Sequence, residues 1–266
     1  MYNIYKGFPM LNIKQCLIFI LLLTQCSFSL FAHDLWLGAK WNAKKTHIQI
    51  IPLVGEHFST GEAIKDHRRF ENASAYLTTS KRLALSSDNK DSTVLGTIER
   101  TPSFVVSTGV KQREISYNDS IAILYLTEEI GLTKEKAAEY LTPGVKEYSE
   151  TYSRHLKTVV ITGETIPKDT AIDVPLQIQL LSWKAVDTGK ALVRLRILEN
   201  GKPLGSIPVR VVSGGTTKIV NCDSSGVAET DVDPRQPILL AYIQLKKLSD
   251  NRLNSVWTNL AIYRLP

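Results

Sequence analysis

The sequence predicts a mainly β protein of two β-sandwich-like domains, the first with an inserted helical hairpin. Residues 174–266 contain short segments of alternating apolar and polar residues, with turn signals about every 8–12 residues, which is typical of a sandwich. The stretch Thr46–Ile51 alternates in the same way near the start of the chain. Residues 132–157 change to helical spacing. The polar stretch 163–173 is the expected linker, so the predicted domains are residues 33–163 and 174–266.

The first 32 residues have the three-part pattern of a cleavable secretory signal peptide. Lys14 supplies a positive charge, residues 16–23 form an apolar run, and a short exit region leads to Ala32. The run is shorter than the ~20 apolar residues that a membrane-spanning helix needs. Met10 is an alternative start for the same leader. Cleavage after Ala32 predicts a periplasmic protein whose mature form does not span the membrane.

A lipid-anchored form is the competing interpretation of this leader. Cys26 follows the apolar run, as a lipidated cysteine does, but Gln25 stands where such sites have a small residue. A diacylated Cys26 would eliminate a free amino terminus at His33. We therefore favour simple cleavage after Ala32.

The charge balance argues against a dedicated nucleic-acid-binding surface. Lys6 and Lys14 leave with the leader, which lowers the net charge from +6 to +4, and the chain has no long run of Lys or Arg. Cys16 and Cys26 leave as well, so Cys222 alone remains and an internal disulfide is impossible. Because turn-forming residues follow Cys222, we expect a partly buried structural thiol.

The helical hairpin is predicted at about residues 132–157. Leu132–Leu141 has helical composition and Pro143-Gly144 ends it. A second helix is expected over Val145–Lys157 because residues at steps of three and four would share one helical face. The residues on that face would be Tyr148, Tyr152 and either His155 or Leu156.

Part of the C-terminal domain resembles the transthyretin-like and carboxypeptidase-regulatory-like sandwich modules. Asn200-Gly201 is a strong hairpin signal. The resemblance rests on Gly201-Lys202-Pro203-Leu204 with Val209, followed by Cys222-Asp223-Ser224-Ser225-Gly226-Val227-Ala228. Those modules usually have Thr where this chain has Cys222. They are mostly scaffolds, so the resemblance implies a C-terminal domain without catalytic groups of its own.

His33 would be the first residue of the mature chain and is the centre of a predicted metal site. A free α-amine, with a reference pKa near 8, and an imidazole, with one near 6.5, can both give up a proton to a divalent ion. Asp34 can add an oxygen ligand, and His57 and His155 are the candidates for further ligands. Nitrogen ligands suit nickel, cobalt and copper, with copper usually bound most tightly. The predicted cofactor is one divalent transition metal ion, although each histidine alone also fits a solvent-exposed side chain.

Signatures of known enzyme classes are missing from the sequence. It has no His-Glu-x-x-His helix, Gly-x-Ser-x-Gly elbow, phosphate-binding Gly-rich loop or Cys-x-x-Cys pair. We therefore predict a protein that is not an enzyme. A copper-dependent oxidative enzyme would need a second histidine facing the first and an aromatic substrate surface, and the sequence shows neither clearly.

Several short motifs, taken in order, resemble an exported family of unknown function often labelled as a nickel transport complex subunit. They are Ala32-His33-Asp34, Val54-Gly55-Glu56-His57-Phe58, Tyr148 to Lys157, Gly201 to Leu204, and Val256-Trp257. The resemblance covers nearly all of residues 32–266, although the family often has an aromatic residue where this chain has His155. It implies periplasmic nickel or cobalt handling in support of uptake or homeostasis, beside an inner-membrane metal transporter or another envelope protein. The alternative is a metal-free envelope module that binds a protein or carbohydrate partner.

Overall fold

The computed structural model describes the chain from Asp34 onward, apart from short gaps. The described residues are 34–55, 58, 60–71, 73–77, 82–85, 93–170, 172–186 and 189–266. The predicted signal peptide, His33 and His57 lie outside them. The described part is mainly β with several sheets, which confirms the predicted fold class.

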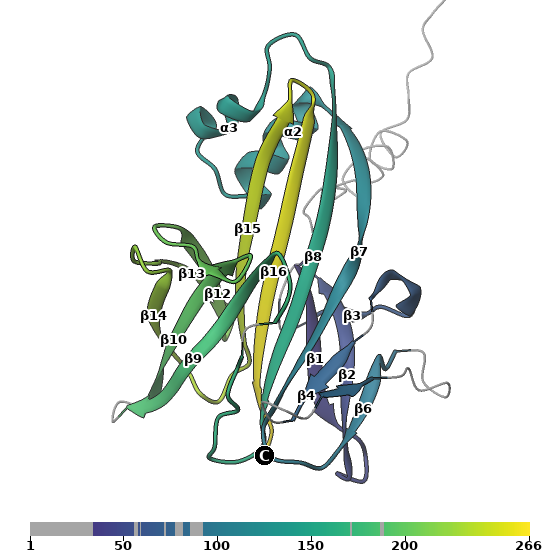
Figure 1. Cartoon of the computed structure of the whole chain (residues 1–266), viewed down its shortest axis with the longest axis vertical. Coiled ribbons are helices and arrows are strands. Elements are labelled where there is room, and N and C mark those ends of the chain that lie inside the picture. Colours follow the sequence, from purple (N-terminus) through teal and green to yellow (C-terminus); the bar gives the residue numbers. More distant parts are fainter. Residues whose placement is uncertain are drawn as a thin grey trace, which may run out of the picture. The chain divides into compact units, whose positions relative to one another are not determined.

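Three sheets make up this β structure (Figure 1). The N-terminal sheet contains β1 (Asp34–Trp41), β2 (His47–Gly55), β3 (Glu62–Ala63) and β6 (Gly96–Glu99). The C-terminal sheet contains β9 (Leu176–Val186), β10 (Lys190–Glu199), β11 (Lys202–Pro203) and β14 (Val227–Val232). The central sheet has the order β13-β12-β15-β16-β8-β7-β4-β5. Its strands are β4 (Ser74–Tyr76), β5 (Arg82–Ala84), β7 (Phe104–Asn118), β8 (Glu147–Ile161), β12 (Pro208–Ser213), β13 (Thr216–Asn221), β15 (Ile238–Ser249) and β16 (Arg252–Arg264).

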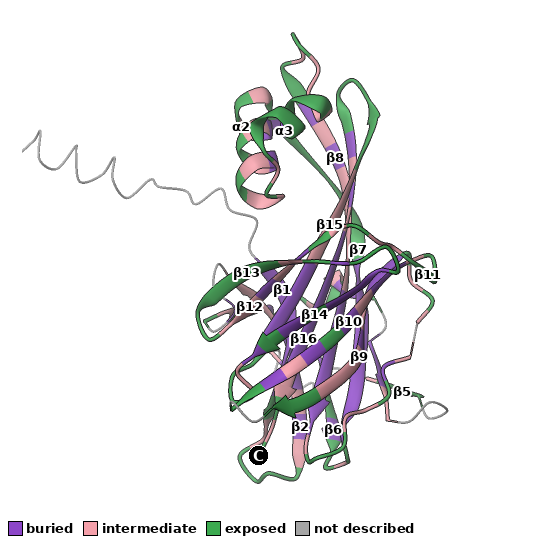
Figure 2. Cartoon of the chain, turned by 90° about the vertical axis from the view of Figure 1, so that its left-hand side faces the viewer, coloured by how far each residue is buried: buried purple, intermediate pink, exposed green. Residues whose placement is uncertain are grey.

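The central sheet is apolar on both faces because alternate residues of its strands enter different cores. Leu156 and Val160 of β8 pack in one core with residues of β1 and β2. Val159 and Ile161 pack in another core with residues of β9 and β10. The N-terminal and C-terminal sheets therefore cover opposite faces of the central sheet, and Figure 2 shows its inner strands buried over this region.

Both predicted sandwich regions contribute strands to the central sheet. β4, β5, β7 and β8 come from residues 33–163, and β12, β13, β15 and β16 come from residues 174–266. The junction is a parallel pair, β8 with β16, which runs from Ser149↔Arg252 to Ile161↔Arg264. The two regions are thus joined edge to edge by backbone hydrogen bonds.

Four long strands, β7, β8, β15 and β16, continue past the two outer sheets, and we call this extension the arm (Figure 1). The chain between β7 and β8 forms α2 (Asp119–Leu124), the π-helical turn η2 (Tyr125–Glu129) and α3 (Lys134–Tyr140). Ala122 of α2 packs with Tyr117, Tyr148 and Leu253 on one face of the arm. No helix among the described residues is long and apolar enough to cross a membrane.

The prediction of a second helix in the hairpin is wrong, because Glu147–Ile161 forms strand β8. Tyr148 and Tyr152 are four residues apart, and this spacing puts two side chains on one face of a strand as well as of a helix. The aromatic and β-branched residues of this stretch favour the strand. The first helix is present as α3, where the Thr133 side chain accepts a hydrogen bond from the Lys136 N–H.

Gly205, between β11 and β12, allows two turns to touch. A Cβ atom at this position would lie 2.4 Å from the carbonyl oxygen of Ser224 and 2.6 Å from that of Asp223. The Asp223 carboxylate holds this turn, since its Oδ1 accepts hydrogen bonds from the N–H groups of Ser225 at 2.8 Å and Val227 at 3.0 Å. Cys222 beside it is buried, and burial raises the pKa of its thiol to about 11, in agreement with a structural role.

We expect Gly205→Ala to lower the free energy of unfolding by about 1–3 kcal/mol, because the backbone oxygens it would meet are fixed by the turn. Urea denaturation of the mature protein measures this change. Gly163→Ala is the control, since no atom lies within 4 Å of a Cβ there, and it should leave stability unchanged. Equal urea concentrations at the midpoint of unfolding for the two variants would contradict the expectation.

Candidate functional site

Asp34 begins β1 and is held by an ion pair with Arg210 of β12. Asp34 is 7% exposed. The Arg210 Nη1 lies 3.0 Å from Asp34 Oδ2, and Nη2 donates to Oδ1, so the pairing is bidentate. Both carboxylate oxygens are therefore engaged, and a bidentate pair of this kind fixes orientation as well as position.

The next two residues of β1 are also anchored. The Asn259 side-chain amide donates to the Leu35 carbonyl at 2.6 Å. The Trp36 Nε1 donates to the Tyr263 hydroxyl at 3.1 Å, and the Trp36 ring meets Phe58 edge to face with centroids 5.2 Å apart. Asn259 and Tyr263 belong to β16, so the start of β1 is fastened to the central sheet.

The register of the first two strands places two histidine-bearing segments at the same end. Asp34 pairs with Gly55, and the pairing continues to Trp41↔Ile48. His33 directly precedes Asp34, and His57 follows Gly55 by two residues. These two predicted ligands lie outside the described residues, but their sequence neighbours face each other across the hairpin.

His155 does not share a site with Asp34. Its neighbour Leu156 points into the core that contains β1, so the alternation of β8 directs His155 to the opposite face of the central sheet. There it pairs with Gly109 and Thr258. Both ring nitrogens are buried without a hydrogen-bond partner, and burial lowers the pKa of the ring while the nearby charge of Glu71 opposes this shift. The structure therefore does not bring His155 together with Asp34.

A buried polar cluster on the arm was not anticipated from the sequence. Glu150 of β8 is 0% exposed. It accepts hydrogen bonds from the hydroxyls of Tyr117 and Tyr125, both at 2.8 Å, and from Ser255, whose oxygen also accepts from Trp257 Nε1 at 2.9 Å. Burial raises the pKa of both tyrosines, and the charge of Glu150 adds to it. We call these five residues the Glu150 cluster.

Arg154 links the Glu150 cluster to the start of β1. Its guanidinium lies over the Trp257 ring at 4.3 Å from the centroid. Burial lowers its pKa, and nearby negative charges, including those of Asp34 and Glu129, oppose this shift. Every second residue of this stretch, namely Tyr148, Glu150, Tyr152 and Arg154, points to the same face of β8. This alternation is the sequence signal of a strand that could have identified the cluster.

The described residues do not by themselves make a metal centre. Among them, no group of three or more His, Cys, Asp or Glu side chains is placed to hold one ion. A protein metal site commonly uses three or four such ligands. Any site at the start of β1 therefore depends on donors from His33 and the segment after Gly55.

Comparisons with known proteins leave the family open. No family model matches the chain, and no curated protein matches it. One solved structure with a reported likeness is described as "Structural insight into host cell surface retention of a 1.5-MDa bacterial ice-binding adhesin". The TM-score is 0.25 at 11% identity, over 88% of this chain and 65% of that chain, which is just under two thirds of its length. A likeness this low carries no argument about function.

Proposed function

We propose that the exported mature chain binds one divalent transition metal ion at its amino terminus, in support of nickel, cobalt or copper uptake or homeostasis in the periplasm. The α-amine and imidazole of His33 form the chelate. The observation that carries the proposal is the pairing of Asp34, which follows His33 in the sequence, with Gly55, which precedes His57 by two residues. Nickel and cobalt follow from the family resemblance, whereas copper follows from the nitrogen ligands.

Chain connectivity makes His33 and His57 the histidines with the shortest links to the Asp34–Gly55 pair. His33 is one residue from Asp34, and His57 is two residues from Gly55. Paired residues of antiparallel strands have Cα atoms about 4.5–5.5 Å apart. His57 is thus the best remaining candidate for a third ligand.

Asp34 acts in this proposal as an anchor. Both of its oxygens are bound by Arg210, so metal coordination would have to displace a bidentate ion pair. The anchored Asp34 instead fixes the start of β1, the point from which His33 extends in the sequence. The proposed ligand set is therefore His33 and His57, completed by water or by a partner such as an inner-membrane metal transporter.

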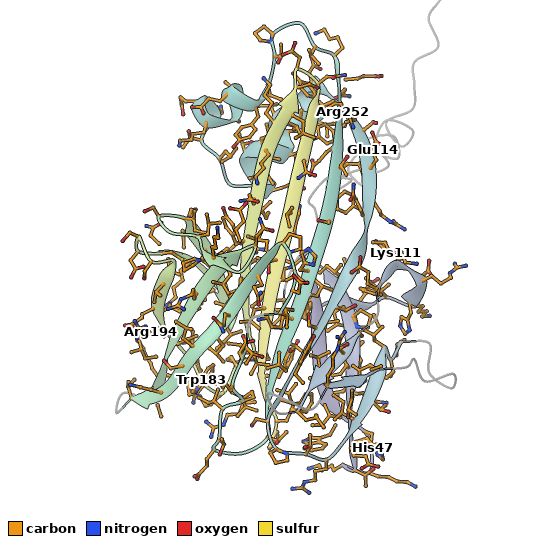
Figure 3. All side chains as sticks on the ribbon, in the orientation of Figure 1. His47, Lys111, Glu114, Trp183, Arg194 and Arg252 are labelled. Atoms are coloured by element: carbon orange, nitrogen blue, oxygen red, sulfur yellow. The ribbon has the colours of Figure 1, made fainter. Side chains whose placement is uncertain are left out.

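The proposal predicts that His33→Ala weakens metal binding by at least roughly 10–100-fold, the loss seen even when residues that only orient ligands are changed. The protein is purified from periplasm, its amino terminus is determined, and it is titrated with nickel, cobalt and copper by calorimetry. His47→Ala is the matched control, because His47 starts β2 at the end of the hairpin away from Asp34 (Figure 3). A mature start other than His33, or equal affinities for wild type and His33→Ala, would refute the proposal.

One observation favours a second candidate function, a metal-free envelope module that binds a protein partner through the arm. Along β16, the buried Leu253 and Ser255 alternate with the half-buried Asn254 and Val256. α2, η2 and α3 pack on the Leu253 side. On the other side Val256 packs against the core that contains β9 and β10, and no described residue of these three helices belongs to that core. Partner capture that is unchanged after chelation, and lost with an Asn254→Arg variant, would favour this function over metal binding.

A further inference from the structure

A buried ion pair joins the central sheet to the connection that leads into β9. Lys157 of β8 and Asp169 of the connection are 4% and 5% exposed. The Lys157 Nζ lies 2.9 Å from Oδ1 and 3.1 Å from Oδ2 of Asp169, and 3.3 Å from Oε1 of Gln177. The pair is remote from the start of β1 in the fold, since Lys157 and the apolar residues of β9 lie on the other face of the central sheet.

Burial disfavours the charged form of both groups. It lowers the pKa of Lys157 and raises the pKa of Asp169, while the charge of each partner opposes these shifts. Both shifts move the pair toward a neutral amine beside a neutral carboxylic acid. An isolated ion pair is also poorly stabilised in an apolar interior, because its desolvation cost can exceed the Coulombic attraction.

The surroundings of the pair orient both groups. The Leu180 N–H donates to Asp169 Oδ2 at 2.7 Å, so it polarises the carboxyl group. Gln177 is fixed by Ile172, whose N–H donates to its Oε1 at 3.2 Å and whose carbonyl accepts from its Nε2 at 2.6 Å. The Gln177 oxygen in turn accepts from Lys157 and holds the amine in place.

We propose that Lys157 and Asp169 condense into an intramolecular amide bond that fastens the connection to β8. The neutral Nζ attacks Cγ of Asp169 and forms a tetrahedral intermediate whose oxyanion is stabilised by the Leu180 N–H. One proton passes from the nitrogen to the leaving oxygen, the Cγ–Oδ1 bond breaks, and one water molecule leaves. The product is a neutral amide, so neither group can be charged afterwards, and the reaction requires no oxidant, cofactor or other reactant.

The mass of the folded mature wild-type protein tests this proposal. We expect it to be lower than the sequence mass by one water molecule, and to fall with time after synthesis if the reaction is slow. After tryptic digestion, fragmentation should identify a branched peptide that joins Lys157 to Asp169. A folded wild-type protein that keeps its full mass, or a loss of water with a linear Lys157 peptide, would overturn the proposal; the latter identifies a cyclic imide at an aspartate.

Two variants distinguish formation of the Lys157–Asp169 amide from other reactions that release water. Lys157→Arg keeps the positive charge but cannot condense, so it should keep its full mass. Gln177→Glu adds a carboxyl group that can carry the proton from Nζ to the leaving oxygen, so the bond should form faster than in wild type. Bond formation in Gln177→Glu but never in wild type would also overturn the proposal. These readouts are independent of metal binding at His33.

Discussion

Replacing Glu150 by alanine is expected to lower the free energy of unfolding by about 2–4 kcal/mol. The change removes the common acceptor of three hydroxyl groups, those of Tyr117, Tyr125 and Ser255, and an unsatisfied buried polar group costs about 1–3 kcal/mol. It also leaves a cavity at a fully buried position. Because Tyr125 begins η2, the helical segment should lose its main polar attachment to the arm.

Urea denaturation of the mature protein measures the global effect, and limited proteolysis of residues 119–140 measures the local one. Glu150→Gln keeps the size and one acceptor oxygen, so its loss should be smaller. Glu147→Ala, at an exposed position on the same strand, should change stability by no more than about 0.5 kcal/mol. A Glu150→Ala protein as stable and as protease-resistant as Glu147→Ala would show that the Glu150 cluster does not contribute to the stability of the fold.

Trp36→Ala is expected to have the larger effect of the two, a loss of about 3–5 kcal/mol, which is typical of truncating a buried tryptophan. Trp36 is 0% exposed. It packs against Phe58 and donates to the Tyr263 hydroxyl, and a Cβ atom at Gly61 would lie only 2.3 Å from its ring. Burial raises the pKa of the Tyr263 hydroxyl, and the hydrogen bond from Trp36 opposes this shift.

Thermal and urea denaturation check this prediction, with Trp183→Ala as the control. Trp183 lies on β9 and is only half-buried (Figure 3), so its loss should cost less. Trp36 lies two residues after Asp34, so Trp36→Ala should also weaken metal binding at His33 if the proposed function is correct, whereas Trp183→Ala should not. Equal stability losses for both variants would contradict the role given to Trp36.

Much of the β structure follows from local sequence. The alternation of Thr46–Ile51 corresponds to β2, and that of Ala191–Leu198 lies within β10. Both strands have one face in a core, so period-two patterning is strong. The helical prediction for Val145–Lys157 failed because its residues recur at four-residue steps, which a strand also satisfies, and because both faces of β8 carry buried residues over its second half.

The pairing of distant strands could not be read from local patterns. β8 and β16 are about a hundred residues apart and pair in parallel along the whole of β16. The residues of either strand do not by themselves specify its partner. The packing of the two cores on opposite faces of the sheet determines which strands pair. This pairing joins the two predicted regions through one sheet.

By itself, the sequence determined the mainly β class, and it predicted His33, Asp34, His57 and His155 as candidate ligands. Only the tertiary structure decided which candidates belong together. Asp34 and Arg210 are 176 positions apart, and they meet because β1 packs on the face of the central sheet to which Arg210 of β12 points. His155 is excluded because side chains alternate along a strand, so one residue of offset from Leu156 sends it to the other face. Local chemistry is a property of residues, whereas proximity depends on strand pairing between distant parts of the chain.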